Sequence, residues 1–274
     1  MSCSVNPFSS LQATHLSQDS LVSLPFPQRG CTQRSIREPA VDRVSMLWDQ
    51  VAKIRSVAEV EGSVTWKGKA YPSLMDAQRS VFEKSTAESE LLKNFIFPSE
   101  KRGTVLDLGC GVGANSVFFA EKGWKVFALD RDEVLLNLCR KSVLEVPNLQ
   151  QPPEMILGDI TRCEFPDQVD IVVCTDVLPY ISPQKMEATM KKIHQAIRPQ
   201  GFFIGSLLFL EKLDRNQRWI DLTRGLGAHF YPTKEMALDV VSHSGFKIEY
   251  SPPCIVQSEE IVVDFVASKT SKNP

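Results

Sequence analysis

Three acidic residues follow short hydrophobic segments and could bind a charged ligand. Asp107 precedes a glycine-rich run, Asp130 ends the next β-rich segment, and Asp159 follows a third. Carboxylates attract cations and accept hydrogen bonds from hydroxyl and amino groups. The three acids therefore suit a cationic nucleoside, with Asp107 near an amino acid moiety, Asp130 on ribose hydroxyls and Asp159 near an adenine amino group.

The glycine-rich run from Gly109 to Gly113 allows two interpretations. Glycine lets the backbone turn sharply and approach a ligand without a Cβ in the way. The run also satisfies the loose pattern G-x-G-x-x-[GA], with Asp130 about 20 residues further on, as in dinucleotide-binding proteins. A nicotinamide oxidoreductase is therefore an alternative. It does not account for Asp159, nor for Asp107, whose charge would repel a pyrophosphate.

Strand and helix patterns alternate along the second half of the chain. Strands are expected at 104–108, 124–129, 154–157, 169–174, 202–209, 246–250 and 261–267, and helices at 115–122, 132–143, 183–198 and 233–244. This alternation predicts an α/β, doubly wound, mostly parallel sheet, and the last two strands predict an antiparallel hairpin at its edge. Such sheets bind ligands at the carboxyl ends of their strands, where the three acids are expected to lie.

Composition limits the remaining classes. The 274 residues include 31 Lys and Arg against 33 Asp and Glu, so no general basic surface for nucleic acid is expected. No apolar run approaches the roughly 20 residues that span a bilayer, so no membrane partner is expected. The cysteines form no C-x-x-C pair, and no metal is expected.

The amino-terminal segments are expected to lie outside the α/β domain, which is assigned to residues 99–268. Residues 1–40 are rich in Ser and Pro and are expected to be disordered, residues 41–98 to form a helical cap with a turn-rich connector near 62–72, and residues 269–274 to form a tail. No secretory signal is visible, and a cytoplasmic location is expected. The Ser- and Arg-rich leader leaves organelle targeting or a translocated effector as alternatives.

Five segments together resemble the successive motifs of the class I S-adenosylmethionine-dependent methyltransferases: VLDLGCGVG, VFALDRD, LGDI, VDIVVCTDVLPYI and IRPQGFFIGSL. The resemblance covers about residues 85–268. It implies a Rossmann-like, seven-stranded sheet with an antiparallel last strand, S-adenosylmethionine as cofactor, and methyltransferase activity. The cofactor-binding residues that we expect on this basis are Asp107, Gly109, Cys110, Gly111, Gly113, Asn115, Asp130, Arg131, Asp159, Ile160, Thr175, Asp176 and Val177.

Two further residues are candidates at the methyl acceptor. The resemblance places Tyr180 near the acceptor, and His229 stands in a connector near the expected rim of the site. By contrast, Cys110 is expected to be a small residue of the loop rather than a catalytic thiol, and His194 a partly exposed residue of its helix.

The acceptor is expected to be a small molecule. The segment after the fourth expected strand lacks the [DN]-P-P-[YFW] motif of nucleic-acid amino methyltransferases and the paired glutamates of arginine methyltransferases. A protein methyltransferase, including a translocated effector, and a non-catalytic S-adenosylmethionine-binding protein are the alternatives.

Overall fold

Strands from the middle and the end of the chain form one sheet in the computed structural model. The structure describes residues 64–66, 69–71, 102–147, 149–175, 177–208, 234–251 and 262–270. The strands of the sheet are β3 (Thr104–Leu108), β4 (Lys125–Asp130), β5 (Glu154–Leu157), β6 (Val169–Cys174), β7 (Ile197–Leu208), β8 (Phe246–Tyr250) and β9 (Val262–Lys269). Their spatial order is β5-β4-β3-β6-β7-β9-β8.

The strand order reverses beside β3. The chain runs from β3 outward through β4 to β5 and then returns to β6 on the other side of β3. These strands and β7 are parallel, whereas β9 pairs antiparallel with both β7 and β8. The predicted seven-stranded, mostly parallel sheet with an antiparallel last strand is thus confirmed. Its switch point, where open sheets bind ligands, lies between the carboxyl ends of β3 and β6.

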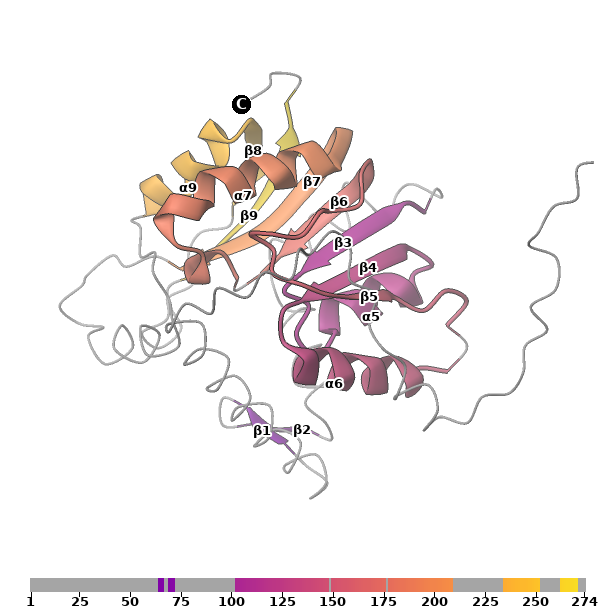
Figure 1. Ribbon diagram of the computed structural model, residues 1–274. Helices are drawn as coiled ribbons and strands as arrows, with labels where there is room; N and C mark the ends of the chain where they lie inside the picture. The colour runs from indigo at the N-terminus through magenta and orange to yellow at the C-terminus, as the bar shows by residue number, and fades with distance from the viewer. Residues whose placement is uncertain are drawn as a thin grey trace, which may run out of the picture.

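Helices cover both faces of the sheet. They are α5 (Ala114–Glu121), α6 (Glu133–Leu144), α7 (Pro183–Ala196) and α9 (Lys234–His243), with a short 3-10 helix η2 (Leu178–Tyr180) after β6. Alternate residues of β3 face opposite layers: Val105 packs with Phe119 of α5, and Leu106 belongs to the cluster that contains Met190 of α7. In Figure 1, α7 and α9 lie at the β7–β9 end of the sheet, and α5 and α6 at the β3–β5 end.

The start of α6 shows how local sequence determines where a helix begins. Asp132 has an extended backbone, and its carboxylate accepts hydrogen bonds from the N–H groups of Val134 (2.9 Å) and Leu135 (3.2 Å). Such a cap stabilises a helix by about 1 kcal/mol. Burial contributes more, because each fully buried side chain such as Leu136 adds roughly 1.5–3 kcal/mol.

Two expected boundaries differ from the structure. The connector expected near 62–72 contains an antiparallel hairpin of β1 (Val64–Trp66) and β2 (Lys69–Tyr71). Strand β7 begins at Ile197, directly after α7, because Pro199 favours an extended backbone at the preceding residue. The expected disordered leader, most of the helical cap and the last four residues lie outside the described residues.

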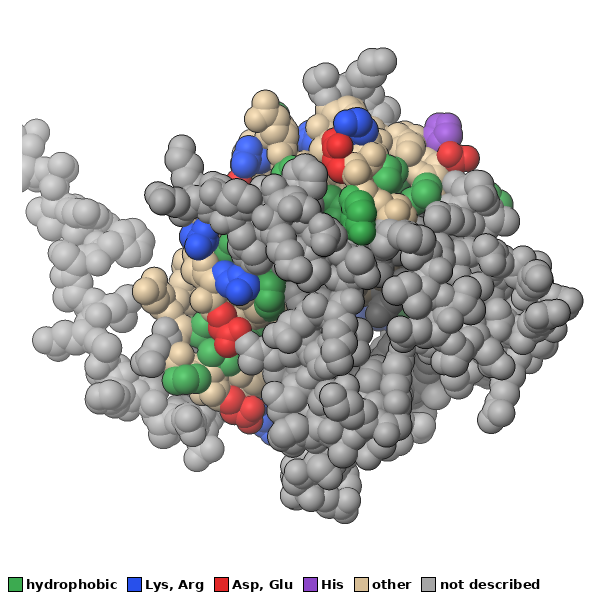
Figure 2. Space-filling view, turned by 180° about the vertical axis from the view of Figure 1, so that it is seen from behind, with side chains coloured by type: hydrophobic (Ala, Val, Ile, Leu, Met, Phe, Trp, Pro, Cys, Tyr) green, Lys and Arg blue, Asp and Glu red, His purple; other side chains and the backbone are tan. Residues whose placement is uncertain are grey.

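The described surface carries charges of both signs. On the face shown in Figure 2, the described Lys and Arg side chains are interspersed with Asp and Glu. Within the described ranges, no helix combines the length and the apolar character needed to cross a membrane.

His194 is buried, and the expectation that it is partly exposed was wrong. Its ring is 2% exposed and lies edge-on to Phe246, with 5.1 Å between the ring centroids. The apolar stripe of α7 is wider than expected because the β8–β9 hairpin packs over it. Burial, with a smaller effect of Lys269, lowers the pKa of His194 below its ordinary value near 6.5, although backbone hydrogen bonds with Gly245 and Thr270 oppose this.

We expect His194 to reduce stability at acidic pH. Because its pKa is lower in the folded chain, the unfolded chain binds the proton more readily, and the free energy of unfolding falls as the pH drops below about 6.5. His194→Gln should make this fall shallower in urea unfolding measured between about pH 7 and 5. His243→Gln, which changes an exposed residue at the end of α9, is the control. Equal slopes in the wild type and in His194→Gln would contradict the assignment.

Candidate functional site

The loop between β3 and α5 contains three glycines with left-handed backbones. Their φ angles are 72° at Gly109, 56° at Gly111 and 91° at Gly113. A Cβ added at Gly109 would collide with Val177, and one added at Gly113 with Cys139. At Gly111, by contrast, an added Cβ would have no atom within 4 Å. Two glycines are therefore required by packing, whereas the third borders space that a ligand can occupy.

Asp130 fixes this loop at the end of β4. Its carboxylate accepts hydrogen bonds from the N–H groups of Gly111 and Asp132, each at 2.9 Å. Burial raises the pKa of Asp130, and these two N–H groups oppose the shift. Each carboxylate oxygen has two lone pairs, so Asp130 can also accept hydrogen bonds from the hydroxyls of a ligand.

Asp107 lies one strand away, at the end of β3, and is 1% exposed. Its carboxylate accepts a 2.6 Å hydrogen bond from the hydroxyl of Ser116 in the first turn of α5. Burial, with a smaller contribution from the Asp130 charge, raises the pKa of Asp107 to about 7, although the hydroxyl of Ser116 opposes this shift. Ser116 was missed in the sequence, where it is one more small polar residue; only the packing of α5 on β3 brings it to the carboxylate.

The end of β6 forms the other wall of the site. Asn115 Nδ2 donates to Thr175 Oγ1 at 3.2 Å and so links the start of α5 to the end of β6. Val177 lies against Gly109. The next element, η2, carries the candidate acceptor residue Tyr180, which is half-buried. The structure thus brings these residues together at the switch point.

Other expected site residues lie at or beyond its margin. The Asp159 carboxylate, after β5, accepts from the N–H of Thr161 at 2.8 Å and is partly exposed. The side chain of Ile160 belongs to the core, so only its backbone is available to a ligand, and Arg131 is exposed. The expected residues Asp176 and His229 lie outside the described residues.

Cys110 is not suited to act as a nucleophile. Its thiol is buried against that of Cys139, and this hydrogen bond and burial raise the pKa of Cys110 well above its ordinary value. The thiolate is the reactive form of cysteine, so Cys110 stays an inert thiol. This agrees with the expectation that it is a small residue of the loop.

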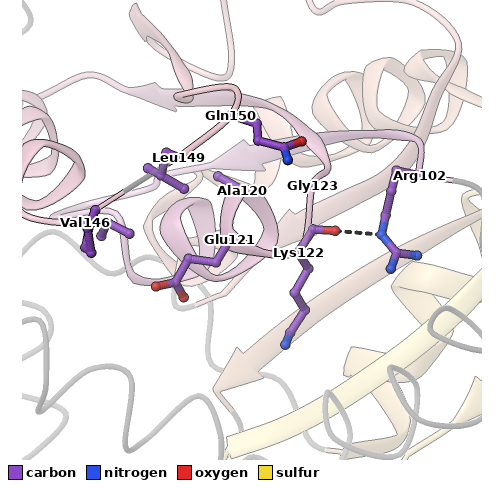
Figure 3. A pocket seen from close by; sticks show the side chains of 9 residues that line it. Arg102, Ala120, Glu121, Lys122, Gly123, Val146, Leu149 and Gln150 are labelled. Carbon is purple, nitrogen blue, oxygen red and sulfur yellow. Dashed lines mark hydrogen bonds between the residues drawn. The ribbon is translucent and has the colours of Figure 1, made fainter.

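A hollow of about 630 Å³ lies at the end of the sheet where its parallel strands begin, away from the candidate site. Figure 3 shows that it is bordered by Arg102, Lys122 and Gln150, among others, and that Arg102 donates to the Lys122 carbonyl. These residues stand before the amino ends of β3, β4 and β5, whereas Asp107 and Asp130 end their strands. The hollow is therefore separate from the candidate site. Among the described residues, no three His, Cys, Asp or Glu side chains are grouped to hold a metal.

Known methyltransferases resemble this chain in sequence and in fold. Residues 105–201 match a family model described as "Methyltransferase domain". A carboxy-S-adenosyl-L-methionine synthase of Vibrio atlanticus is 31% identical over 137 residues, which are 48% of this chain and 54% of that protein. A ubiquinone biosynthesis O-methyltransferase of Pseudomonas paraeruginosa is 29% identical over 115 residues, 42% of this chain and 46% of that protein.

A solved structure shares the fold over most of the chain. The magnesium protoporphyrin IX methyltransferase of Synechocystis PCC 6803, with bound S-adenosylhomocysteine, superimposes with a TM-score of 0.61 at 17% identity. The alignment covers 85% of this chain and 100% of that one. The chain spans about half the length of the curated relatives it matches.

Proposed function

We propose that this chain is a class I S-adenosylmethionine-dependent methyltransferase that transfers the methyl group of that cofactor to a small-molecule acceptor. The observation that carries this proposal is the open space at Gly111, whose N–H donates to the buried carboxylate of Asp130, with the buried Asp107 on the neighbouring strand. S-adenosylmethionine is the cofactor of this family, and it combines an ammonium group, a ribose and a sulfonium. Two acids on neighbouring strands at this loop suit the ammonium and the ribose.

The residues of the chain have separate roles in this proposal. Asp130 accepts hydrogen bonds from the ribose hydroxyls, Asp107 attracts the ammonium, and Gly111 leaves room for the ligand. The bound cofactor supplies an activated methyl group, and the protein needs to align the acceptor with it and exclude water. Tyr180 is our candidate for contact with the acceptor, because η2 follows the strand end that borders the cofactor site.

A small acceptor is favoured by the relatives. The O-methyltransferase of ubiquinone biosynthesis and the magnesium protoporphyrin IX methyltransferase are both named for small molecules. A panel of small metabolites incubated with the protein and isotopically labelled cofactor tests the proposal. We expect one metabolite to gain the mass of a methylene group, with S-adenosylhomocysteine as the second product. Label found only in protein would instead support a protein methyltransferase.

A second candidate is a reaction that modifies the cofactor itself. The observation that favours it is the 31% identity with a carboxy-S-adenosyl-L-methionine synthase. The same incubation distinguishes the two when the panel includes carboxylic acids that can donate their carboxyl group. The cofactor would then gain the mass of carbon dioxide, the donor acid would lose its carboxyl group, and no methylated metabolite would form.

Asp130→Ala tests the cofactor site before the acceptor is known. We expect the dissociation constants of S-adenosylmethionine and S-adenosylhomocysteine to rise about 10- to 100-fold, since hydrogen bonds to a charged group contribute roughly 1.5–3 kcal/mol. Isothermal titration calorimetry measures both. Asp170→Ala is the matched control, because Asp170 also accepts a backbone N–H, that of Thr104, but lies at the other end of the sheet. Unchanged affinity in Asp130→Ala would remove Asp130 from the site.

A further inference from the structure

Asp107 and Ser116 form a buried polar pair inside the protein. The Ser116 hydroxyl is fully buried and donates to Asp107 Oδ2 at 2.6 Å. Val105, two residues earlier on the same face of β3, and Val173, the partner of Asp107 on β6, are apolar and fully buried. A hydroxyl that donates to a buried carboxylate favours its charged form, which burial alone would suppress.

Few charged or titratable groups face this pair from the described elements. Asp130 approaches from β4 and opposes a negative charge on Asp107. The thiol of Cys110, on the loop, contacts Cys139 of α6, and this contact and burial raise the pKa of Cys110 well above its ordinary value. The Asn115 amide, on α5, donates to the carboxylate and favours its charge. Burial and the Asp130 charge therefore oppose a negative charge on Asp107, whereas the side chains of Ser116 and Asn115 favour it.

We propose that Ser116 is a positioning residue that keeps Asp107 available as an anion for the cofactor's ammonium, and that cofactor binding releases a proton from Asp107. The proposal rests on the proposed function, because it assumes that S-adenosylmethionine or its product binds beside Asp107. The ammonium brings the positive charge that the free site lacks, so the bound state favours the carboxylate. The proton on the Asp107 carboxyl of the free protein passes to solvent, and no bond to carbon changes.

This coupling makes cofactor affinity depend on pH. The pKa of Asp107 is raised to about 7 in the free protein, so below pH 7 most molecules must lose a proton before the ammonium binds. The dissociation constant should therefore rise by about tenfold for each pH unit below this midpoint. Ser116→Ala removes a group that lowers the pKa of Asp107, and the midpoint should move upward by about one pH unit.

The experiment measures S-adenosylhomocysteine binding to the full chain by calorimetry between about pH 5.5 and 8. Buffers with different heats of ionisation give the number of protons released. We expect nearly one proton from the wild type at about pH 6, and a midpoint shifted upward in Ser116→Ala. Ser116→Thr, which keeps a hydroxyl, should restore the wild-type midpoint. Ser268→Ala is the matched control, because Ser268 donates a 2.6 Å hydrogen bond to Glu249 between β9 and β8.

The outcomes separate this inference from the proposed function. No binding by the wild type at any pH would overturn the proposed function. Binding that releases no proton would overturn the inference alone. So would a Ser116→Ala variant that binds more weakly by the same factor at every pH, because that is the result of a merely structural role. If Ser116→Ala does not fold, Ser116→Cys, with its weaker donor, should still shift the midpoint upward.

Discussion

Replacing Gly111 by alanine should abolish most cofactor binding while the protein stays folded. The added Cβ meets no protein atom within 4 Å, so it creates no clash in the free chain. It projects instead into the space that we assign to the cofactor. We expect the dissociation constant of S-adenosylhomocysteine to rise at least about 100-fold, because a methyl group in a filled site displaces the ligand or the loop.

Gly123→Ala controls for the backbone strain in this experiment. Gly123 also has a left-handed backbone, with φ at 79°, and an added Cβ would make only ordinary contacts with Arg102. Both variants should lose about 1–2 kcal/mol of stability, the cost of a left-handed alanine. Only Gly111→Ala should lose affinity. Equal affinities in the two variants would place the cofactor elsewhere.

The fold was largely predictable because hydrophobic patterning is local. Each strand of the sheet was expected within a few residues of its observed bounds, apart from the early start of β7. The antiparallel β9 followed from the short spacing after β8. The expectation that was wrong concerns a contact between elements that are distant in sequence. The burial of His194 requires the β8–β9 hairpin to lie over α7, and nothing within the sequence of α7 indicates that contact.

The candidate site was predictable in its residue types but not in its contacts. Asp107 and Asp130 were identified because each lies at the end of an expected strand, Asp107 just before the glycine-rich turn and Asp130 about 20 residues further on. The different roles of the three glycines were not evident, because Gly109 and Gly113 are constrained by Val177 and by a cysteine distant in sequence. Ser116 was missed for the same reason, since its importance comes only from a 2.6 Å contact across two elements.

The second large effect is expected for Asp107→Asn, which should make the protein more stable and less able to bind its cofactor. The pKa of Asp107 is about 7 in the folded chain, against an ordinary value of 3.8. Above pH 7 the folded chain therefore carries a buried charge that the unfolded chain exposes to water. Removing that charge should raise the free energy of unfolding at pH 8 by on the order of 2–4 kcal/mol.

The pH dependence identifies the cause of this gain. As the pH falls from 7 towards 4, the wild-type Asp107 takes up a proton in the folded chain and recovers stability, so the difference between the two proteins should disappear. Cofactor affinity at pH 8 should fall about 10- to 100-fold, since asparagine offers the ammonium no charge. A stability gain that persists unchanged at pH 4 would contradict the raised pKa.

For Glu249→Gln we expect the opposite change in the free energy of unfolding. Glu249 accepts a hydrogen bond of the same length, 2.6 Å, from Ser268, but it remains in contact with water. The hydroxyl of Ser268 therefore lowers the pKa of Glu249, and burial opposes this only in part. Loss of this carboxylate should reduce stability at pH 8 and leave cofactor affinity unchanged. The hydroxyl–carboxylate contact thus outweighs burial at Glu249 and stabilises the fold there, whereas at Asp107 burial outweighs the same contact and the charged acid makes the fold less stable.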